Sequence, residues 1–141
     1  MLVNEIMTRD VQLVAPGDSL QTAAQVMAVY DFGMVPVGEN DRLVGMLTDR
    51  DITTRAVARG LHPGQCRVGE IMSPEVSYVF DDETVEDAAR NMSDLQVRRL
   101  PVLDRTKRLV GIVSLGDLAV TRPMPAADAL TGISQPPQFP G

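Results

Sequence analysis

The chain has 141 residues, a formal net charge of -6 and 44% hydrophobic residues, which is ordinary for a soluble globular protein. The acidic balance disfavours a nucleic-acid partner, because binding to a phosphate backbone needs a basic face. No apolar run approaches the roughly 20 residues that a membrane span needs, and no signal-peptide pattern opens the chain. Cys66 is the only cysteine, so no intrachain disulfide can form. These features predict a cytoplasmic protein with no membrane partner.

An internal repeat organises the sequence. A shift of 65 residues, which becomes 66 after Lys107, aligns residues 3–52 with the second half of the chain. Sixteen of these 50 aligned positions are identical: VNEIMT aligns with VGEIMS, VPV with LPV, and RLVG with RLVG. A unit of about 55 residues buries little surface alone, so two units are expected to share one core.

The first copy predicts the element order β-α-β-β-α. A short β segment is expected over residues 12–14, followed by a turn and a helix whose N-cap is Ser19. The apolar positions of this helix are Leu20, Ala23, Ala24 and Met27. Strands 34–37 and 43–47 are expected to form a hairpin across a polar link, and a second helix begins near Thr48.

The second copy repeats this order. A β segment is expected over residues 77–79, and Thr84 with Asp87 resembles a capping box at the start of a helix. The apolar positions of that helix are Val85, Ala88, Ala89, Met92 and Leu95. Strands 100–103 and 109–113 follow, and a second helix begins near Ser114. The predicted fold class is α/β (α+β), with tandem β-α-β-β-α repeats related by a pseudo-two-fold axis.

The composition also predicts domain boundaries. The first motif is expected over residues 1–60, a Gly/Pro-containing linker over 61–67 and the second motif over 68–121. Residues 122–141 hold five prolines and two glycines and almost no charge, which predicts a flexible tail. Within it, residues 126–130 could form one helical turn.

The candidate site residues follow the last strand of each copy. Thr48 stands three residues before Asp51, and Ser114 stands three residues before Asp117, each pair at a helix start. Free backbone N–H groups and the positive end of the helix dipole suit a phosphate there. A carboxylate accepts two hydrogen bonds, which matches a ribose 2′,3′-diol.

These motifs together resemble a pair of CBS (cystathionine-β-synthase-type) domains, a Bateman module. The matching pieces are EIMT and EIMS, the VPV and LPV strands, and the two G-h-h-[ST]-x-x-D ends, where h is apolar. The resemblance covers residues 3 to about 121. It implies a non-catalytic regulatory homodimer that binds AMP, ADP, ATP or S-adenosylmethionine in clefts between the motifs, requires no cofactor and signals to an unidentified protein effector.

The resemblance also implies roles for single residues. Asp51 and Asp117 would hold ribose hydroxyls, and Thr48 and Ser114 would contact phosphate. Arginines keep their charge at physiological pH, so they are the expected phosphate cations. These arginines are Arg50, Arg98 and Arg99.

The base would lie against the strands that carry the prolines. Backbone groups of Val35 and Leu100, next to Pro36 and Pro101, would meet the adenine edge. The apolar residues expected to sandwich the base are Val11 and Val76.

Several alternatives remain open. Thr48 and Ser114 could simply cap helices, their partner acids could be solvated first-turn residues, and Arg98 with Arg99 could be a charged strand edge. The whole protein could be a structural or interaction dimer with empty clefts. His62 and Cys66 lie four residues apart, but two ligands fall short of the usual four, so neither a metal site nor a catalytic residue is predicted.

Overall fold

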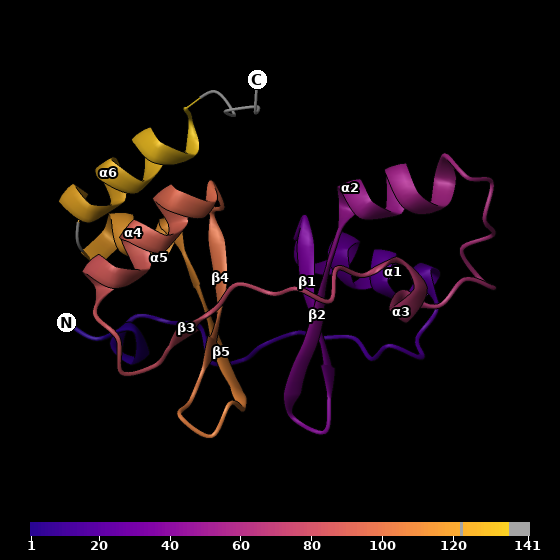
Figure 1. Ribbon diagram of the computed structural model, residues 1–141, viewed down its shortest axis with the longest axis horizontal. Helices are drawn as coiled ribbons and strands as arrows, with labels where there is room; N and C mark the ends of the chain where they lie inside the picture. Colours follow the sequence, from indigo (N-terminus) through magenta and orange to yellow (C-terminus); the bar gives the residue numbers. More distant parts are fainter. Residues whose placement is uncertain (122, 136–141) are drawn as a thin grey trace. The chain divides into compact units, whose positions relative to one another are not determined.

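The computed structural model describes residues 1–121 and 123–135, which form two compact units (Figure 1). We name each unit after its long helix. The α1 unit contains Gln12–Val76 and Lys107–Leu109. The α4 unit contains Met1–Val11, Ser77–Thr106 and the described residues from Val110 onwards. The mixed α/β architecture confirms the predicted fold class.

The α1 unit is built on a β-hairpin. Strands β1 (Met34–Glu39) and β2 (Arg42–Thr48) pair antiparallel, with a register shift after Val37. One parallel bridge from Val14 to Val37 extends β1, and one antiparallel bridge from Ser73 to Met46 extends β2. The helices of this unit are α1 (Leu20–Tyr30), α2 (Asp49–Asp51), the π-helix η2 (Ile52–Val57) and α3 (Val68–Ile71).

The α4 unit repeats this plan. Strands β3 (Val79–Phe80), β4 (Arg99–Leu103) and β5 (Leu109–Ser114) form a sheet in that order, with β3 parallel to β4. A bridge from Thr8 to Ile112 extends β5. The helices are the 3-10 helix η1 (Val3–Glu5), α4 (Val85–Leu95), α5 (Leu115–Thr121) and α6 (Pro123–Ile133).

Matching signals set the ends of the two long helices. Ser19 accepts a hydrogen bond from the backbone N–H of Thr22, and Thr84 accepts one from that of Asp87, so both predicted N-caps are confirmed. The helices end at Asp31 and at Gln96, whose positive φ angles of 55° and 56° place them in the left-handed region. The repeat in sequence is therefore a repeat in local geometry.

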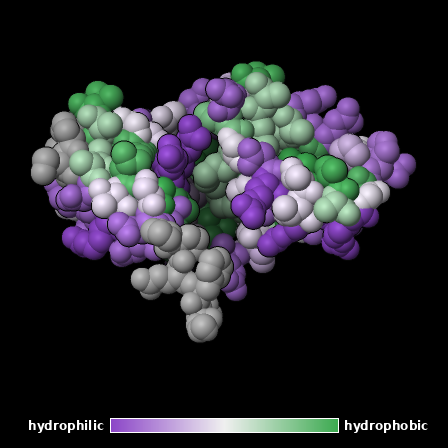
Figure 2. Space-filling model, turned by 90° about the horizontal axis from the view of Figure 1, so that it is seen from above, coloured by the Kyte–Doolittle hydropathy of each residue, from purple (hydrophilic) through white to green (hydrophobic). Residues whose placement is uncertain are grey.

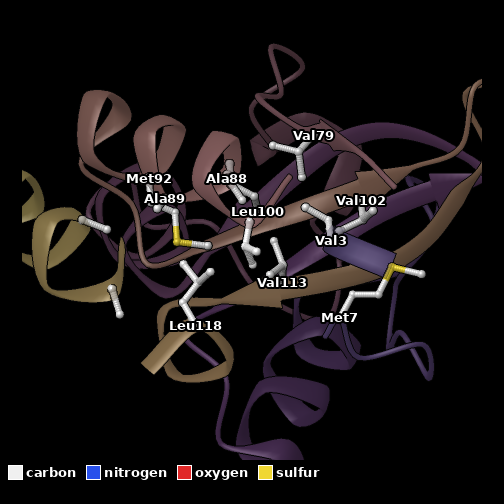
Figure 3. Packing of buried hydrophobic residues seen from close by; sticks show 13 residues of the cluster. Val3, Met7, Val79, Ala88, Ala89, Met92, Leu100, Val102, Val113 and Leu118 are labelled. Carbon is white, nitrogen blue, oxygen red and sulfur yellow. The ribbon is translucent and has the colours of Figure 1, made fainter. Parts of the chain in front are cut away.

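Each unit has its own hydrophobic core, so the expectation of one core shared by the two copies is wrong. In the α4 unit, Leu100, Val102 and Val113 of the sheet pack with α4 and α5, and Figure 3 shows Met92 and Leu118 pointing towards one another. In the α1 unit, β1 and β2 contribute Val35, Val37 and Leu47. The helical positions predicted to be apolar lie mostly in these cores, except that Ala24 and Leu95 are exposed.

The first residues of each copy pack in the unit that holds most of the other copy. The segment of Met7 and Thr8 lies in the α4 unit beside β5, and the matching segment of Met72 and Ser73 lies in the α1 unit beside β2. The sequence motifs are thus continuous along the chain, whereas the compact units are not. Neither unit can be cut out as a single stretch of sequence.

Two expected elements differ in the structure. The β segment of the first copy is reduced to the single bridge at Val14, because one parallel pairing to β1 is all that it forms. The prediction of a flexible tail is wrong for residues 123–133, which form the helix α6. This helix includes the turn expected at residues 126–130. Burial of Ala126 and Ala129 stabilises that helix. The final residues, 136–141, lie outside the described part of the chain.

Apolar residues also reach the surface, where they appear in green among hydrophilic residues in purple (Figure 2). The most exposed large ones are Val120, Val29 and Val57, at 86%, 75% and 65%. No helix in residues 1–121 and 123–135 is both long enough and apolar enough to cross a membrane.

Candidate functional site

The two hydroxyl–carboxylate pairs form the same closed geometry at two helix starts. The backbone N–H of Asp51 donates to Thr48 Oγ1 at 3.0 Å, and the backbone N–H of Thr48 donates to Asp51 Oδ2 at 3.0 Å. In the second copy, the backbone N–H of Asp117 donates to Ser114 Oγ at 3.1 Å, and the backbone N–H of Ser114 donates to Asp117 Oδ2 at 2.9 Å. Both pairs are capping boxes, which confirms the capping alternative for their hydroxyls.

The capping residues can still form hydrogen bonds with a ligand. All four side chains are half-buried, so each still meets solvent while the backbone fixes its orientation. Only Oδ2 of Asp51 takes part in the cap, and Oδ1 lies 3.8 Å from Nε of Arg55. A carboxylate held in this way presents an acceptor in a fixed direction, which suits a hydroxyl-bearing ligand.

A backbone hydrogen bond joins each helix start to the approach of the proline-containing strand. The N–H of Asp49 donates to the carbonyl of Gly33 at 2.9 Å, and the N–H of Leu115 donates to that of Arg98 at 2.8 Å. In the hairpin, Val35 also pairs with Leu47, directly before Thr48. Within each unit, the capping box therefore lies next to the proline-containing strand. The resemblance to CBS domains implies that both of these contact a ligand.

The prolines and the residues before them point into the protein. Val35 and Leu100 are 0% and 2% exposed, and Pro36 and Pro101 are buried beside them. The side chains of Val35 and Leu100 belong to the two cores, so at these positions only backbone groups could meet a base. The contact of these backbone groups with adenine stays a prediction.

The predicted base-sandwiching residues lie in different units. Val11 is half-buried and belongs to the α4 unit, and Val76 is half-buried and belongs to the α1 unit. Each valine therefore lies in the unit that holds the capping box of the other sequence copy, as Met7 and Met72 also do.

The basic residues differ between the copies. Arg50 is exposed on α2, Arg98 is exposed before β4, and Arg99 is half-buried at the start of β4. Sequence reasoning missed Arg55, whose Nη1 donates to the carbonyl of Ile71 at 3.2 Å while its Nε faces Asp51. The signal was its position four residues after Asp51 on a helix.

His62 and Cys66 line a separate cavity of about 400 Å³ in the α1 unit, together with Arg59, Gln65 and Glu70. The Cys66 thiol donates to Glu70 Oε2 at 3.3 Å. Burial, then Glu70, raises the pKa of the thiol, while the backbone N–H of Arg67 and this thiol lower the pKa of the Glu70 carboxyl. Cys66 is therefore held as a thiol, which is the unreactive form.

The described residues include no cluster of three or more His, Cys, Asp or Glu side chains arranged to hold a metal ion. His62 Nδ1 accepts a hydrogen bond from the backbone N–H of Gly64 at 3.0 Å, which orients the ring within its own loop.

A family model described as "CBS domain" matches residues 3–57 and residues 68–122. The chain belongs to the CBS domain family. The two matches cover the two sequence copies and leave residues 58–67 between them, which resembles the predicted organisation of two motifs joined by a linker. Each of the two matched CBS domains therefore contains one of the capping boxes.

Known CBS proteins resemble this chain over most of its length. The CBS domain-containing protein YhcV of Bacillus subtilis is 45% identical over 134 residues, which cover 94% of each chain. Among solved structures, Hypoxic Response Protein I with two coordinated zinc ions has a TM-score of 0.78 and 38% identity, covering 86% of this chain and 98% of that one. The CBS domain pair of MJ0100 in complex with 5-methylthioadenosine and S-adenosyl-L-methionine has a TM-score of 0.73 and 28% identity, covering 85% and 98%.

Proposed function

We propose that this CBS pair is a non-catalytic regulatory module that binds an adenine nucleotide or another adenosyl ligand. The observation that carries the proposal is the pair of matching capping boxes in a chain of the CBS family. The CBS pair of MJ0100, a structural neighbour, was solved with two adenosyl compounds. The ligand class is therefore AMP, ADP, ATP, S-adenosylmethionine or a close relative, and no separate cofactor is required.

The ligand would engage the groups that each unit already fixes. Asp51 and Asp117 would accept hydrogen bonds from ribose hydroxyls, because their carboxylates are oriented by backbone N–H groups. Thr48 and Ser114 would meet phosphate oxygens at the helix starts, with Arg50, Arg98 and Arg99 as the cations of a phosphate chain.

Signalling would pass through a cytoplasmic homodimer that contacts a protein effector. Helix α1 contains no charged residue, and it exposes Val29 at 75% and Tyr30 at 47%. Such an uncharged surface suits contact with a second copy, since no like charges would meet there. Ligand binding changes the output only if the two conformations of the dimer differ in affinity for the ligand.

A second candidate function is a structural or protein-interaction dimer whose sites hold no ligand. The capping boxes favour it, since they satisfy the same side chains without any ligand. It shares the fold and the dimer with the first proposal and differs only in small-molecule binding.

Metabolite release separates the two candidates. Protein purified without added nucleotide would be denatured, and the supernatant analysed by mass spectrometry for adenosine-containing compounds. We expect such a compound in stoichiometric or substoichiometric amount, and much less of it with the Asp51→Asn/Asp117→Asn variant. Equal small-molecule profiles for the two proteins would favour the structural role.

A further inference from the structure

Helix α6 covers the helical face of the α4 unit, where it packs against α4 and α5 (Figure 1). Ala126 and Ala129 are 6% and 0% exposed and belong to the same core cluster as Leu118 of α5. At the other end of α6, the side-chain amide of Gln96 donates to the carbonyls of Gly132 at 3.3 Å and Gln135 at 2.8 Å. Apolar packing and polar contacts therefore both hold α6 in place.

The helix that α6 supports is the one that starts with the second capping box. Ser114 and Asp117 exchange their hydrogen bonds at the start of α5, and Leu118, the next residue, is fully buried in the cluster that includes Ala129. The direction of the Asp117 carboxylate depends on where the first turn of α5 lies. A shift of α5 would therefore move the second site.

The first copy stabilises its corresponding helix in another way. Ala24, the counterpart of the buried Ala89 of α4, is exposed on α1, and most of the π-helix η2 is also exposed. Instead of an apolar cover, Arg55 reaches from η2 to the carbonyl of Ile71 and to Asp51. The counterpart of Arg55 in the second copy is Thr121, which has no guanidinium group.

We propose that α6 is a positioning element for the second ligand site, holding α5 so that Asp117 is oriented for ribose. This inference rests on the proposed function, and it adds that the two sites depend on different parts of the chain. The second site requires α6, whereas the first does not. A chain without α6 would keep its first site and lose affinity at its second.

The test uses one buried and one exposed alanine of the same helix. Ala129→Glu places a charge in the core and should drive α6 from α5, whereas Ala127→Glu, at an exposed position, serves as the matched control. Calorimetric titration with AMP, ATP and S-adenosylmethionine identifies the compound that binds wild type. That compound is then used with Asp51→Asn, which weakens the first site so that the second dominates binding, and with Asp117→Asn, which does the reverse.

In the Asp51→Asn background, Ala129→Glu should weaken binding by about tenfold or more, and Ala127→Glu by less than about twofold. In the Asp117→Asn background, neither alanine substitution should change the affinity. Equal losses in both backgrounds, or no loss in either, would overturn the proposal. If Ala129→Glu does not fold, Gln96→Asn removes the contacts to Gly132 and Gln135 and should give a smaller loss in the same background.

Hydrogen exchange tests whether α6 positions α5 without depending on ligand binding. Ala129→Glu should speed exchange at the amides of Asp117 and Leu118 but not at that of Asp51. If no compound binds wild type, the proposed function fails, and this exchange pattern still decides whether α6 positions α5. Unchanged exchange at Leu118 would overturn the positioning role.

Discussion

The Met72 sulfur lies 2.6 Å from the point that a Cβ atom would occupy on Gly45. Met7 stands in the same relation to Gly111, at 2.5 Å. The methionine of each EIM segment thus packs directly against the glycine that opens a G-h-h-[ST] motif. In each unit the methionine comes from one sequence copy and the glycine from the other, so the contact links the copies.

This contact predicts that Gly45→Ala is destabilising. The added methyl group would meet Met72 and the carbonyl of Ser73 at 2.9 Å, and overpacking of this kind costs about 1–3 kcal/mol of unfolding free energy. Gly17→Ala is the control, because nothing lies within 4 Å of its Cβ position. Urea unfolding should separate the two variants, and equal midpoints would contradict the packing argument.

The capping box of α4 predicts a pH-dependent contribution to stability. The backbone N–H of Thr84, then its side chain, lowers the pKa of the Asp87 carboxyl in the folded state. Because the folded-state pKa is depressed, the contribution is complete above the unfolded pKa of about 3.9 and is lost as pH falls through the folded pKa. The stability difference between wild type and Asp87→Asn should therefore shrink on acidification, as measured by urea unfolding. A difference that stays constant from neutral pH to about pH 2.5 would contradict the role of this carboxylate.

The uncharged helix α1 predicts that Val29→Asp breaks the proposed homodimer. The charge would be buried at the contact between copies, which is unfavourable unless it is paired. The counterpart of Val29 in the second copy is Asp94, so the fold accepts an aspartate at this helical position. Analytical ultracentrifugation should show a dimer for wild type and a monomer for the variant, with unchanged helical content. A variant that remains dimeric would exclude α1 as the contact.

The different surroundings of Asp51 and Asp117 predict two unequal sites. Arg55 lies beside the first carboxylate, and the residue aligned with it in the second copy of the sequence is a threonine, Thr121. Asp51→Asn and Asp117→Asn keep a capping oxygen but remove the charge, so each should weaken one site by roughly tenfold. Titration of the two single variants should give different remaining affinities. Two indistinguishable and independent sites in wild type would refute this asymmetry.

The sequence predicted the local geometry well, because local signals determine it. Ser19, Thr84 and the pairs at Thr48 and Ser114 all lie where a hydroxyl can cap a helix, and each does so. The strand pairs were also predicted, with their ends extended by one or two residues.

Long-range choices were not predictable from one sequence. The EIM segments of the two copies are nearly alike, so nothing in the pattern says that Met7 packs on Gly111 and Met72 on Gly45. Only one turn of helix α6 was expected, because prolines and an uncharged composition indicate a tail, whereas burial of Ala126 and Ala129 against α4 and α5 stabilises a longer helix. The role of Arg55 depends on the carbonyl of Ile71, which only the fold brings near.

The proposed regulatory role depends on the binding of an adenosyl ligand through the two capping boxes. Calorimetric titration of the purified full chain with AMP, ATP and S-adenosylmethionine measures this binding, with a thermal-shift assay on the same samples. We predict saturable heat and a raised unfolding temperature with at least one compound, since ligand at about 100 times Kd adds roughly 2.7 kcal/mol of stability. Both signals should fall with Asp51→Asn/Asp117→Asn. No heat and no thermal shift with any of the three compounds at millimolar concentration would contradict the proposed role.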